Sequence, residues 1–589
     1  MCGIAGIMTI SGAPAPTAVL LPMEKALGHR GPDGTGHYHV GDVGMVQTRL
    51  AIIDLATGDQ PLYESGGAAL MANGEIYNHL ELHADVPQAR LATHSDCELP
   101  LHLYRKFGLD FPKHLRGMYA IALHDPASGR LVLARDPFGI KPLYYAETPL
   151  GLLFGSEAQA LLRSGLVAGE LMRQSRNELL ELQFTTGRET IFAGISRVLP
   201  GETLVVTKGR IIERRRIEAL PHGAIAPLSE EAGLAEFDRV FAESIKLHQR
   251  ADVPYGMFLW GGIDSSAVLA MMARLNERPV KAFTIGFGSA TVSDEREGAR
   301  AVAQEFGAEH QEIDFREGDF WMLLPEIARA MDDPAADYAI LPTYKLAAAA
   351  REAGLKVILS GEGGDELFAG YGRYRSVVRP WWAGGKLLRA RGNLDKLGIL
   401  RGDLAGWRDG VAAAELAAQD GARTRLQVAQ ATDCADWLPN DLLTKLDRCL
   451  MAHGVEGRTP FLDPAIAEFA FALPDELKVR RGLGKYLLRR WLGRHVRAVE
   501  PMAKKRGFTV PVGEWIARRG AQLGPLVAAQ PAVQEICLPS MVEKLFLEAG
   551  GKREGFAAWT LLFYALWHRH HIEGLPKAPD VFTALAARG

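Results

Sequence analysis

The feature of this sequence that most constrains its fold is the alternation of strands and helices in the second half of the chain. An apolar run over 253–259 predicts a buried strand, and a helix rich in small and apolar residues is expected over 266–275. Further strands are expected over 281–287 and 356–359, and helical sequence such as 344–353 separates them. Strands that alternate with helices form a parallel sheet with helices on both faces. The second half is therefore predicted to be an α/β domain.

The first half has a different character, because its apolar segments are short and are interrupted by Gly, Pro and Asp. Buried strands are predicted at 50–53, 68–72, 131–134 and 151–154. Such a strand-rich stretch favours a layered α+β domain. Three arginines at 214–216, then Pro and Gly residues and a candidate helix cap at Ser229, indicate an exposed linker. We therefore expect domains over 1–207 and 231–575, joined by a linker over 208–230.

Composition narrows the class of protein. The chain has 589 residues, 67 basic and 70 acidic, so its net charge of −3 argues against a nucleic-acid partner. No apolar run approaches the roughly 18 residues of a membrane helix, and the opening residues lack the basic stretch of a secretory signal. The five cysteines form no CxxC pair and are too few for a disulfide framework. We expect a cytoplasmic enzyme that binds neither nucleic acid nor membrane.

Cys2 is the first candidate for catalysis. It directly follows Met1, so removal of Met1 would leave a thiol and a free α-amine on one residue. That amine, with a reference pKa of about 7.7–8.0, can act as the general base for its own side chain. A cysteine at position 2 is more often incidental when nothing else supports it, so the motifs that follow decide its meaning.

Four motifs downstream of Cys2 give it that support. They lie at 29–33, 49–52, 73–78 and 95–96. In this order the series resembles the glutaminase domain of class II glutamine amidotransferases. The resemblance implies the four-layer αββα fold of N-terminal-nucleophile hydrolases.

Each matching residue has a chemical reason. Hydrolysis of the glutamine side-chain amide passes through an oxyanion, which needs hydrogen-bond donors fixed in advance. The resemblance implies that the Asn73 side chain and the Gly74 N–H are these donors. The α-carboxylate and α-ammonium of glutamine need partners of opposite charge. The implied catalytic residues are Cys2, Asn73 and Gly74, and the implied glutamine-binding residues are Arg49, Asn73, Glu75 and Asp96.

A glycine turn lies between the predicted strand at 253–259 and the helix after it. Such a turn presents several backbone N–H groups and is a ready anion site. It is not a Walker loop, because GxxxxGK[ST] occurs nowhere in the chain. Residues 260–266 resemble the Ser-Gly-Gly-x-Asp-Ser pyrophosphate loop of ATP pyrophosphatases, except that Trp260 replaces the first serine. Either the indole turns aside and backbone amides bind phosphate, or the ATP site is impaired.

An acidic loop supplies the second half of this site. Three carboxylates, Glu362, Asp365 and Glu366, fall within five residues after a predicted strand, a pattern that suits metal binding and proton transfer. Residues 359–368 resemble the most recognisable signature of the family. The resemblance implies that Glu362 is a general base facing the reacting amine and that Asp365 holds Mg²⁺, while Glu366 supports either role.

The stretch 478–506 holds eleven Lys or Arg residues and one acid. We expect it to face a triphosphate, with Lys485 stabilising charge on the departing pyrophosphate. Residues 283–287 resemble the strand that holds adenine in the family. The expected ATP-binding residues are Leu259, Gly261, Gly262, Asp264, Ser265, Ser266, Ile285, Ser360 and Gly361, and the expected metal ligands are Asp264 and Asp365.

Together these motifs, from residue 1 to about 570, resemble the glutamine-hydrolysing asparagine synthetases. The resemblance implies an α+β glutaminase domain followed by an ATP-pyrophosphatase domain, of the adenine nucleotide alpha hydrolase type. It implies glutamine, aspartate and ATP as substrates, Mg²⁺ as cofactor and an internal tunnel for ammonia. Glutamine would yield ammonia through a thioester on Cys2, and ammonia would displace AMP from β-aspartyl-AMP. A homodimer is compatible with this assignment.

Three alternatives stay open at this point. The acceptor could be another carboxylate, such as a peptide, a sugar acid or the precursor of a secondary metabolite. A β-lactam synthetase-like enzyme would share the fold, but Cys2 and Glu362 both count against it, because such enzymes lack these groups. A glutaminase whose second half only binds nucleotide or partners is supported by Trp260 alone.

Overall fold

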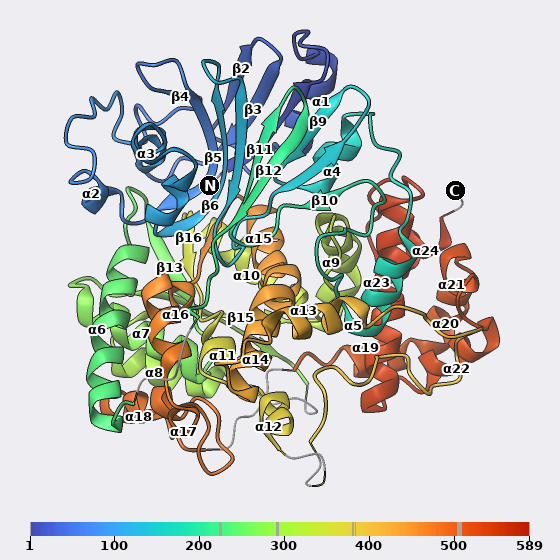
Figure 1. Ribbon diagram of the computed structural model, residues 1–589. Coiled ribbons are helices and arrows are strands. Elements are labelled where there is room, and N and C mark those ends of the chain that lie inside the picture. The colour runs from blue at the N-terminus through green and yellow to red at the C-terminus, as the bar shows by residue number, and fades with distance from the viewer. Residues whose placement is uncertain are drawn as a thin grey trace.

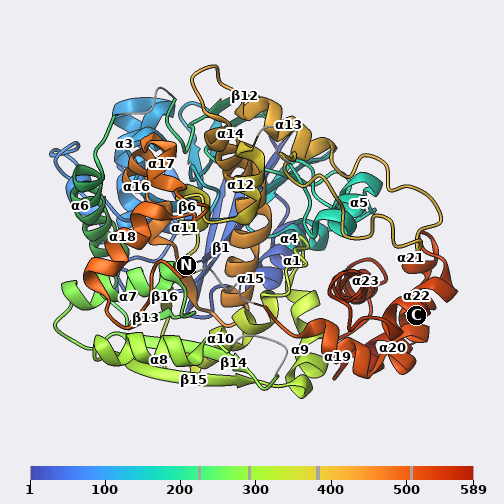
Figure 2. The same cartoon turned by 90° about the horizontal axis from the view of Figure 1, so that it is seen from below.

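The structure is a computed structural model that describes residues 2–222, 227–289, 294–379, 382, 385–503 and 509–587. Figure 1 shows two parts, one with two antiparallel sheets at the top and one with a parallel sheet and most of the helices below. The N-terminal end of β1 (Cys2–Thr9) lies between these parts, near the middle of Figures 1 and 2. The chain begins, therefore, where the two domains meet.

The first domain contains two six-stranded antiparallel sheets. In the first sheet β1 lies between β9 and β3. Its strands, in spatial order, are β10 (Ser196–Arg197), β8 (Tyr144–Glu147), β9 (Gly151–Gly155), β1, β3 (Val43–Arg49) and β2 (Gly34–Val40). The second sheet has the order β12 (Arg210–Arg216), β11 (Glu202–Thr207), β7 (Arg130–Arg135), β6 (Gly117–Asp125), β5 (Ala69–Ile76) and β4 (Leu62–Tyr63).

Alternating side chains place these sheets in the middle of four layers. Ile4 and Met8 of β1 point inward and share a core with Met71 of β5. The residues between them, Ala5 and Ile7, point outward into a core that includes α1 (Thr17–Leu27) and α4 (Ala158–Arg163). On the far side, the outer face of the second sheet packs on α3 (Leu99–Phe107). Successive residues of a strand point to opposite faces of the sheet, so each sheet packs on the other sheet with one face and on helices with the other. The expected αββα layering is thereby confirmed.

The second domain contains the expected parallel sheet, with five strands. Their order is β15 (Glu309–Phe315), β14 (Lys281–Phe287), β13 (Tyr255–Phe258), β16 (Val357–Leu359) and β17 (Glu456–Arg458). One face packs on α6 (Glu230–His248) and α7 (Ile263–Leu275). The other face packs on α10 (Ile340–Glu352) and α15 (Thr444–Met451). Apolar residues on both strand faces are thus buried, as a parallel sheet requires.

Helices surround this sheet and extend beyond it. Besides α10 and α15, the described residues between 296 and 495 form α8 (Arg296–Glu305), α9 (Glu317–Ala330), α11 (Gly364–Leu367), α12 (Gly372–Val378), α13 (Asp409–Ala418), α14 (Arg425–Thr432), the π-helix Asp433–Leu443, α16 (Pro464–Ala472), α17 (Asp475–Lys478) and α18 (Tyr486–His495). A C-terminal group, red in Figure 1, comprises α19 (Val512–Arg518), α20 (Gly520–Ala528), α21 (Pro531–Gln534), α22 (Pro539–Leu547), α23 (Lys552–His571) and α24 (Val581–Ala586). In the described part of the chain, no helix has the length and apolarity needed to cross a membrane.

The stretch 208–230 begins differently from the exposed linker that we expected. Strand β12 pairs with β11 and completes an edge of the second sheet. Its arginines alternate between exposed and half-buried positions, and Arg214 reaches Glu202 at 3.1 Å. The end of the stretch agrees with the sequence, because Ser229 Oγ caps α6 by accepting the N–H of Ala232 at 3.3 Å.

Candidate active sites

Cys2 and Asn73 face each other across the two sheets of the first domain. The backbone N–H of Cys2 donates to Asn73 Oδ1 at 3.2 Å. The Cys2 side chain is buried, and burial raises the pKa of its thiol although the backbone N–H of Leu50 acts against this. A thiol with a raised pKa is a poor nucleophile until a base takes its proton.

The Asn73 side-chain amide has one buried end that makes no hydrogen bond within the described residues. Its oxygen already accepts from Cys2, and its Nδ2 is buried with no hydrogen-bond acceptor among the described residues. A buried donor without an acceptor costs about 1–3 kcal/mol. Such a donor beside a nucleophile is suited to an oxyanion. Gly74 follows on the same strand, where an added Cβ would lie 2.2 Å from the Met118 carbonyl oxygen.

Arg49 lies next to Cys2 in the pairing of β1 with β3. Its guanidinium donates to Asp59 Oδ1 at 2.6 Å and to the Asp54 carbonyl at 2.5 Å. The Arg49 guanidinium is thus oriented toward the loop that carries Asp54 and Asp59. The Asp59 side chain is largely exposed, so a carboxylate ligand at this position would meet the same guanidinium.

The two carboxylates expected to hold the glutamine ammonium, Glu75 and Asp96, are both buried. Burial raises the pKa of Glu75, and Asp96 and Glu456 raise it further. Burial also raises the pKa of Asp96, whose Oδ2 accepts the Ile76 N–H at 2.6 Å. An ammonium group brought to this pair would relieve their repulsion.

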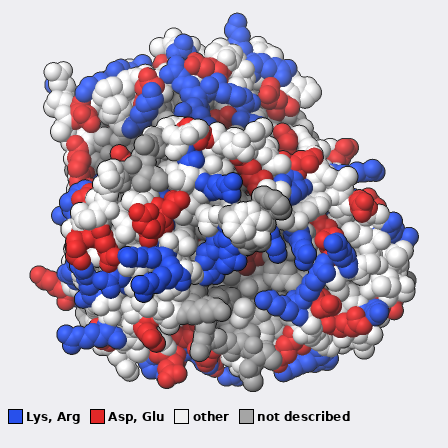
Figure 3. All heavy atoms as spheres, turned by 60° about the horizontal axis from the view of Figure 1, so that its bottom comes forward, with Lys and Arg blue, Asp and Glu red and all other residues white. Residues whose placement is uncertain are grey.

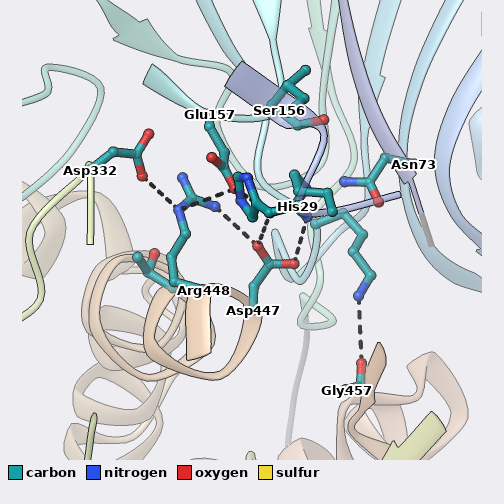
Figure 4. Close-up of polar contacts among 12 residues, drawn as sticks. His29, Asn73, Ser156, Glu157, Asp332, Asp447, Arg448 and Gly457 are labelled. Atoms are coloured by element: carbon teal, nitrogen blue, oxygen red, sulfur yellow. Dashed lines mark hydrogen bonds and ion pairs between the residues drawn. The ribbon is translucent and has the colours of Figure 1, made fainter. Parts of the chain in front are cut away.

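A network of buried charges connects Cys2 to the second domain. Arg30 donates to the Cys2 carbonyl at 3.2 Å and to both Glu157 and Asp447 at 2.7 Å. Arg448 donates to Asp447 at 3.0 Å. Figure 4 shows Glu157, Asp447 and Arg448 grouped with His29 and Asp332. The sequence motifs contain Arg30, but they do not reveal its partners on α15, because only the packed domains bring them together.

The pyrophosphate-like loop joins β13 to α7. Gly261 has a φ of +67°, and an added Cβ would lie 2.9 Å from the Glu295 carbonyl oxygen, so glycine is required there. An added Cβ on Gly262 would meet nothing within 4 Å. Ser265 Oγ accepts the Trp260 N–H at 3.2 Å and donates to the Gly262 carbonyl at 3.3 Å. The loop therefore holds its shape while the backbone at Gly262 stays open to a ligand.

The Trp260 indole packs toward the core behind the loop. Its ring meets the Phe258 ring edge-on at 6.2 Å between centroids. It is half-buried against the core cluster that contains Phe283 and Ile285. Trp260 also lines the cavity next to the loop, so the indole lies between the core and that cavity.

A cavity of about 720 Å³ lies at this end of the parallel sheet. The expected residues on its wall are Gly261, Gly262, Asp264, Ser265, Ser360, Gly361, Glu362, Asp365, Glu366 and Lys485. Leu259, Ser266 and Ile285 are buried and do not line the cavity. Arg375 and Arg489 also line it, and Figure 3 shows Lys and Arg side chains gathered around the middle of one face.

Lys485 lies between the two expected metal ligands. Its ammonium is hydrogen-bonded to Asp264 and lies 2.7 Å from Asp365 Oδ1. Burial would lower the pKa of Lys485, but these two carboxylates hold it above its usual value. Carboxylate oxygens are the type of ligand that Mg²⁺ prefers, and in this structure the cation between the two carboxylates is the Lys485 ammonium. Within the described residues no group of three His, Cys, Asp or Glu side chains is placed to hold a metal, so substrate oxygens would complete such a site.

Glu362 faces a pair of charged residues that the sequence did not reveal. Lys445 Nζ lies 3.1 Å from Asp337 Oδ2 and 3.8 Å from Glu362 Oε1. Burial raises the pKa of Glu362, and Lys445 opposes this. Beside it, burial and Asp365 raise the pKa of Glu366 to about 8, and Glu366 accepts the Tyr371 hydroxyl at 2.8 Å. Carboxylates with raised pKa values are suited to proton transfer near neutral pH.

Two family models match the chain. The one described as "Asparagine synthase" matches residues 236–569, and the one described as "Glutamine amidotransferase domain" matches residues 1–216. The second match ends at the last residue of β12. Together the two matches cover both sites described above.

Several relatives are similar over nearly the whole chain. A protein of Mycobacterium tuberculosis named "Putative asparagine synthetase [glutamine-hydrolyzing]" is 33% identical over 97% of this chain and 98% of its own length. "Asparagine synthetase [glutamine-hydrolyzing] 1" of Bacillus subtilis is 30% identical over 97% of each chain. "Amidase chyE" of Penicillium rubens is 33% identical over 64% of this chain and 60% of its own.

Proposed function

The chain belongs to the asparagine synthase family of glutamine-dependent ligases, and on that premise we propose that its acceptor is aspartate. In this proposal the β-carboxylate is converted to β-aspartyl-AMP by ATP, and ammonia from glutamine converts it to asparagine. The observation that carries the proposal is the end-to-end similarity to proteins named asparagine synthetases. Asparagine, AMP, pyrophosphate and glutamate would be the products.

In the first site we propose that Cys2 is the nucleophile once Met1 has been removed. The α-amine of Cys2 takes the thiol proton, and the thiolate attacks the side-chain carbonyl of glutamine. The oxyanion accepts hydrogen bonds from Asn73 Nδ2 and the Gly74 N–H. The amine returns its proton to the departing ammonia, and water then releases glutamate from the thioester. The buried, acceptor-free Nδ2 supports this sequence.

In the second site the acceptor carboxylate attacks the α-phosphorus of ATP, and pyrophosphate leaves. Asp264 and Asp365 would hold Mg²⁺, which would neutralise charge on the triphosphate. Lys485 lies against both carboxylates and is placed to stabilise the leaving pyrophosphate. Glu362 then accepts a proton from the amine as it attacks the adenylate, and its raised pKa supports this role.

The test is release of pyrophosphate from Mg·ATP in the presence of glutamine and aspartate, with asparagine identified by mass. Asparagine and pyrophosphate in equal amounts would support the proposal. Glutamate without pyrophosphate would leave a working glutaminase and contradict aspartate as the acceptor or ATP as the activating substrate.

A second candidate acceptor is a different carboxylate. This candidate is favoured by the similarity to "Amidase chyE", whose name does not mention asparagine. The same assay with a panel of peptides, sugar acids and amino acids separates the two. Pyrophosphate release that aspartate does not stimulate, but another carboxylate does, would replace aspartate in the proposal.

A further inference from the structure

Arg458 lies between the two candidate sites. It is the last residue of β17 and is fully buried. Its guanidinium donates to Glu456 Oε1 at 2.5 Å and, through Nη1, to the His248 and Arg250 carbonyls at 2.9 and 2.7 Å. The Nε and Nη1 atoms of the guanidinium are therefore held by groups of the second domain.

The remaining guanidinium nitrogen, Nη2, points to the glutamine site. Arg458 Nη2 lies 3.6 Å from Glu75 Oε2, and neither atom has a hydrogen-bond partner among the described residues. The guanidinium also lies 5.4 Å from the centroid of the Tyr77 ring, on the same segment of the first domain. Glu75 is one of the two carboxylates expected to hold the glutamine ammonium, so Arg458 contacts that site directly.

The backbone of Arg458 contacts the nucleotide cavity. Its carbonyl accepts the N–H of Ser360 at 2.8 Å, and β17 pairs with β16 up to Leu359. Ser360 lies on the cavity wall and begins the loop that carries Glu362. One residue thus joins a glutamine-binding carboxylate to the loop of the second site.

We propose that Arg458 is a positioning residue that couples occupancy of the glutamine site to the nucleotide loop, an inference that rests on the proposed function. An ammonium bound at Glu75 and Asp96 places a second positive charge within reach of the Arg458 guanidinium. Because the guanidinium is held by carbonyls of its own domain, the repulsion acts on β17 and on Ser360. Coupling of this kind is reciprocal between the two ligands.

The experiment uses Cys2→Ala, which retains the glutamine-binding residues but has no nucleophile. The Kd of Mg·ATP is measured by calorimetry without glutamine and with saturating glutamine. Glutamine is expected to change this Kd by about fivefold or more. Adding Arg458→Lys, which keeps the charge but loses the planar fork, is expected to bring the ratio of the two Kd values to about one while each ligand alone still binds.

Arg116→Lys is the matched control, because Arg116 also joins the domains, through Asp463 at 2.8 Å, without contacting Glu75 or Ser360. It should leave the ratio as in Cys2→Ala. An equal ratio in Arg458→Lys and its parent, or a ratio of one in the parent, would overturn the coupling. So would loss of both ligands in Arg458→Lys, which indicates a structural role. Absence of Mg·ATP binding in Cys2→Ala itself would overturn the proposed function as well.

A second measurement does not require the Cys2→Ala variant. With Cys2 present, Arg458→Lys should change the ratio of glutamate to pyrophosphate produced, because glutamine at Glu75 and Asp96 no longer acts on the nucleotide loop. An unchanged ratio at normal rates would contradict the inference.

Discussion

The Asn73 side chain accepts the backbone N–H of Cys2 at 3.2 Å through Oδ1, and its Nδ2 is left buried without an acceptor among the described residues. In the proposed mechanism one amide therefore both positions the nucleophile and offers a donor to the reacting carbonyl. Asn73→Ala should lower glutaminase kcat by about 10²–10³, the loss seen when one oxyanion donor is removed. Steady-state glutamate release measures this, and synthesis from added ammonia should stay near the wild-type rate.

The proposed function separates the chemistry of the two sites, and a Cys2 variant tests this most directly. Cys2→Ala should abolish the use of glutamine, because no other residue contributes a nucleophile in the proposed sequence. Pyrophosphate release driven by ammonium chloride should persist, since the cavity wall does not include Cys2. Equal loss with both nitrogen donors would contradict this separation.

Sequence patterns named those residues of the candidate sites that lie within one motif. Cys2 and Asn73 are such residues, and so are the glycines of the β13–α7 loop. Arg458, Lys445 and Asp337 were not predicted as site residues, because tertiary packing alone brings their helices and strands to the sites. Strand β12 was missed because a run of arginines is typical of an exposed linker. In the structure this strand nevertheless pairs with β11.

Trp260 is expected to contribute to stability rather than to limit catalysis. Trp260→Ser removes the contact with Phe258 and should lower the free energy of unfolding by about 1–2 kcal/mol, since the indole is only half-buried. The affinity for Mg·ATP should change little, because the loop glycines, not the indole, offer the N–H groups. Trp260→Phe is the matched control and should keep most of the stability. A Kd that falls tenfold or more in Trp260→Ser would show instead that the indole obstructs the site.

Glu366 should make the folded state sensitive to alkaline pH. Its pKa is raised from 4.5 to about 8, so the folded chain keeps a proton that the unfolded chain releases between these values. Stability contributed by this group is therefore lost as the pH rises through that window. Glu366→Gln should remove that loss, and urea unfolding at pH 5.5 and 8.5 compares it with the wild type. Glu476→Gln, an exposed site, should leave the pH dependence unchanged.

Asp447 is the shared acceptor of two buried arginines in the charge network that joins the two domains. It accepts from Arg30 at 2.7 and 3.0 Å and from Arg448 at 3.0 Å. Asp447→Asn would leave buried guanidinium charge uncompensated, which costs about 3–5 kcal/mol when one partner of a buried pair is removed. Calorimetric unfolding should show this loss, whereas Asp110→Asn, in an exposed pair with Lys113, should leave the stability nearly unchanged.

The same carboxylate gives a pH signature with the opposite sign to that of Glu366. Burial would raise the pKa of Asp447, but Arg30 holds it below its usual value. Its contribution to stability is therefore present above the ordinary pKa of about 3.9 and is lost as the pH falls through the lower folded value. The stability difference between the wild type and Asp447→Asn should accordingly shrink below about pH 4. A difference that persists unchanged down to pH 2 would show that the loss comes from packing and not from charge.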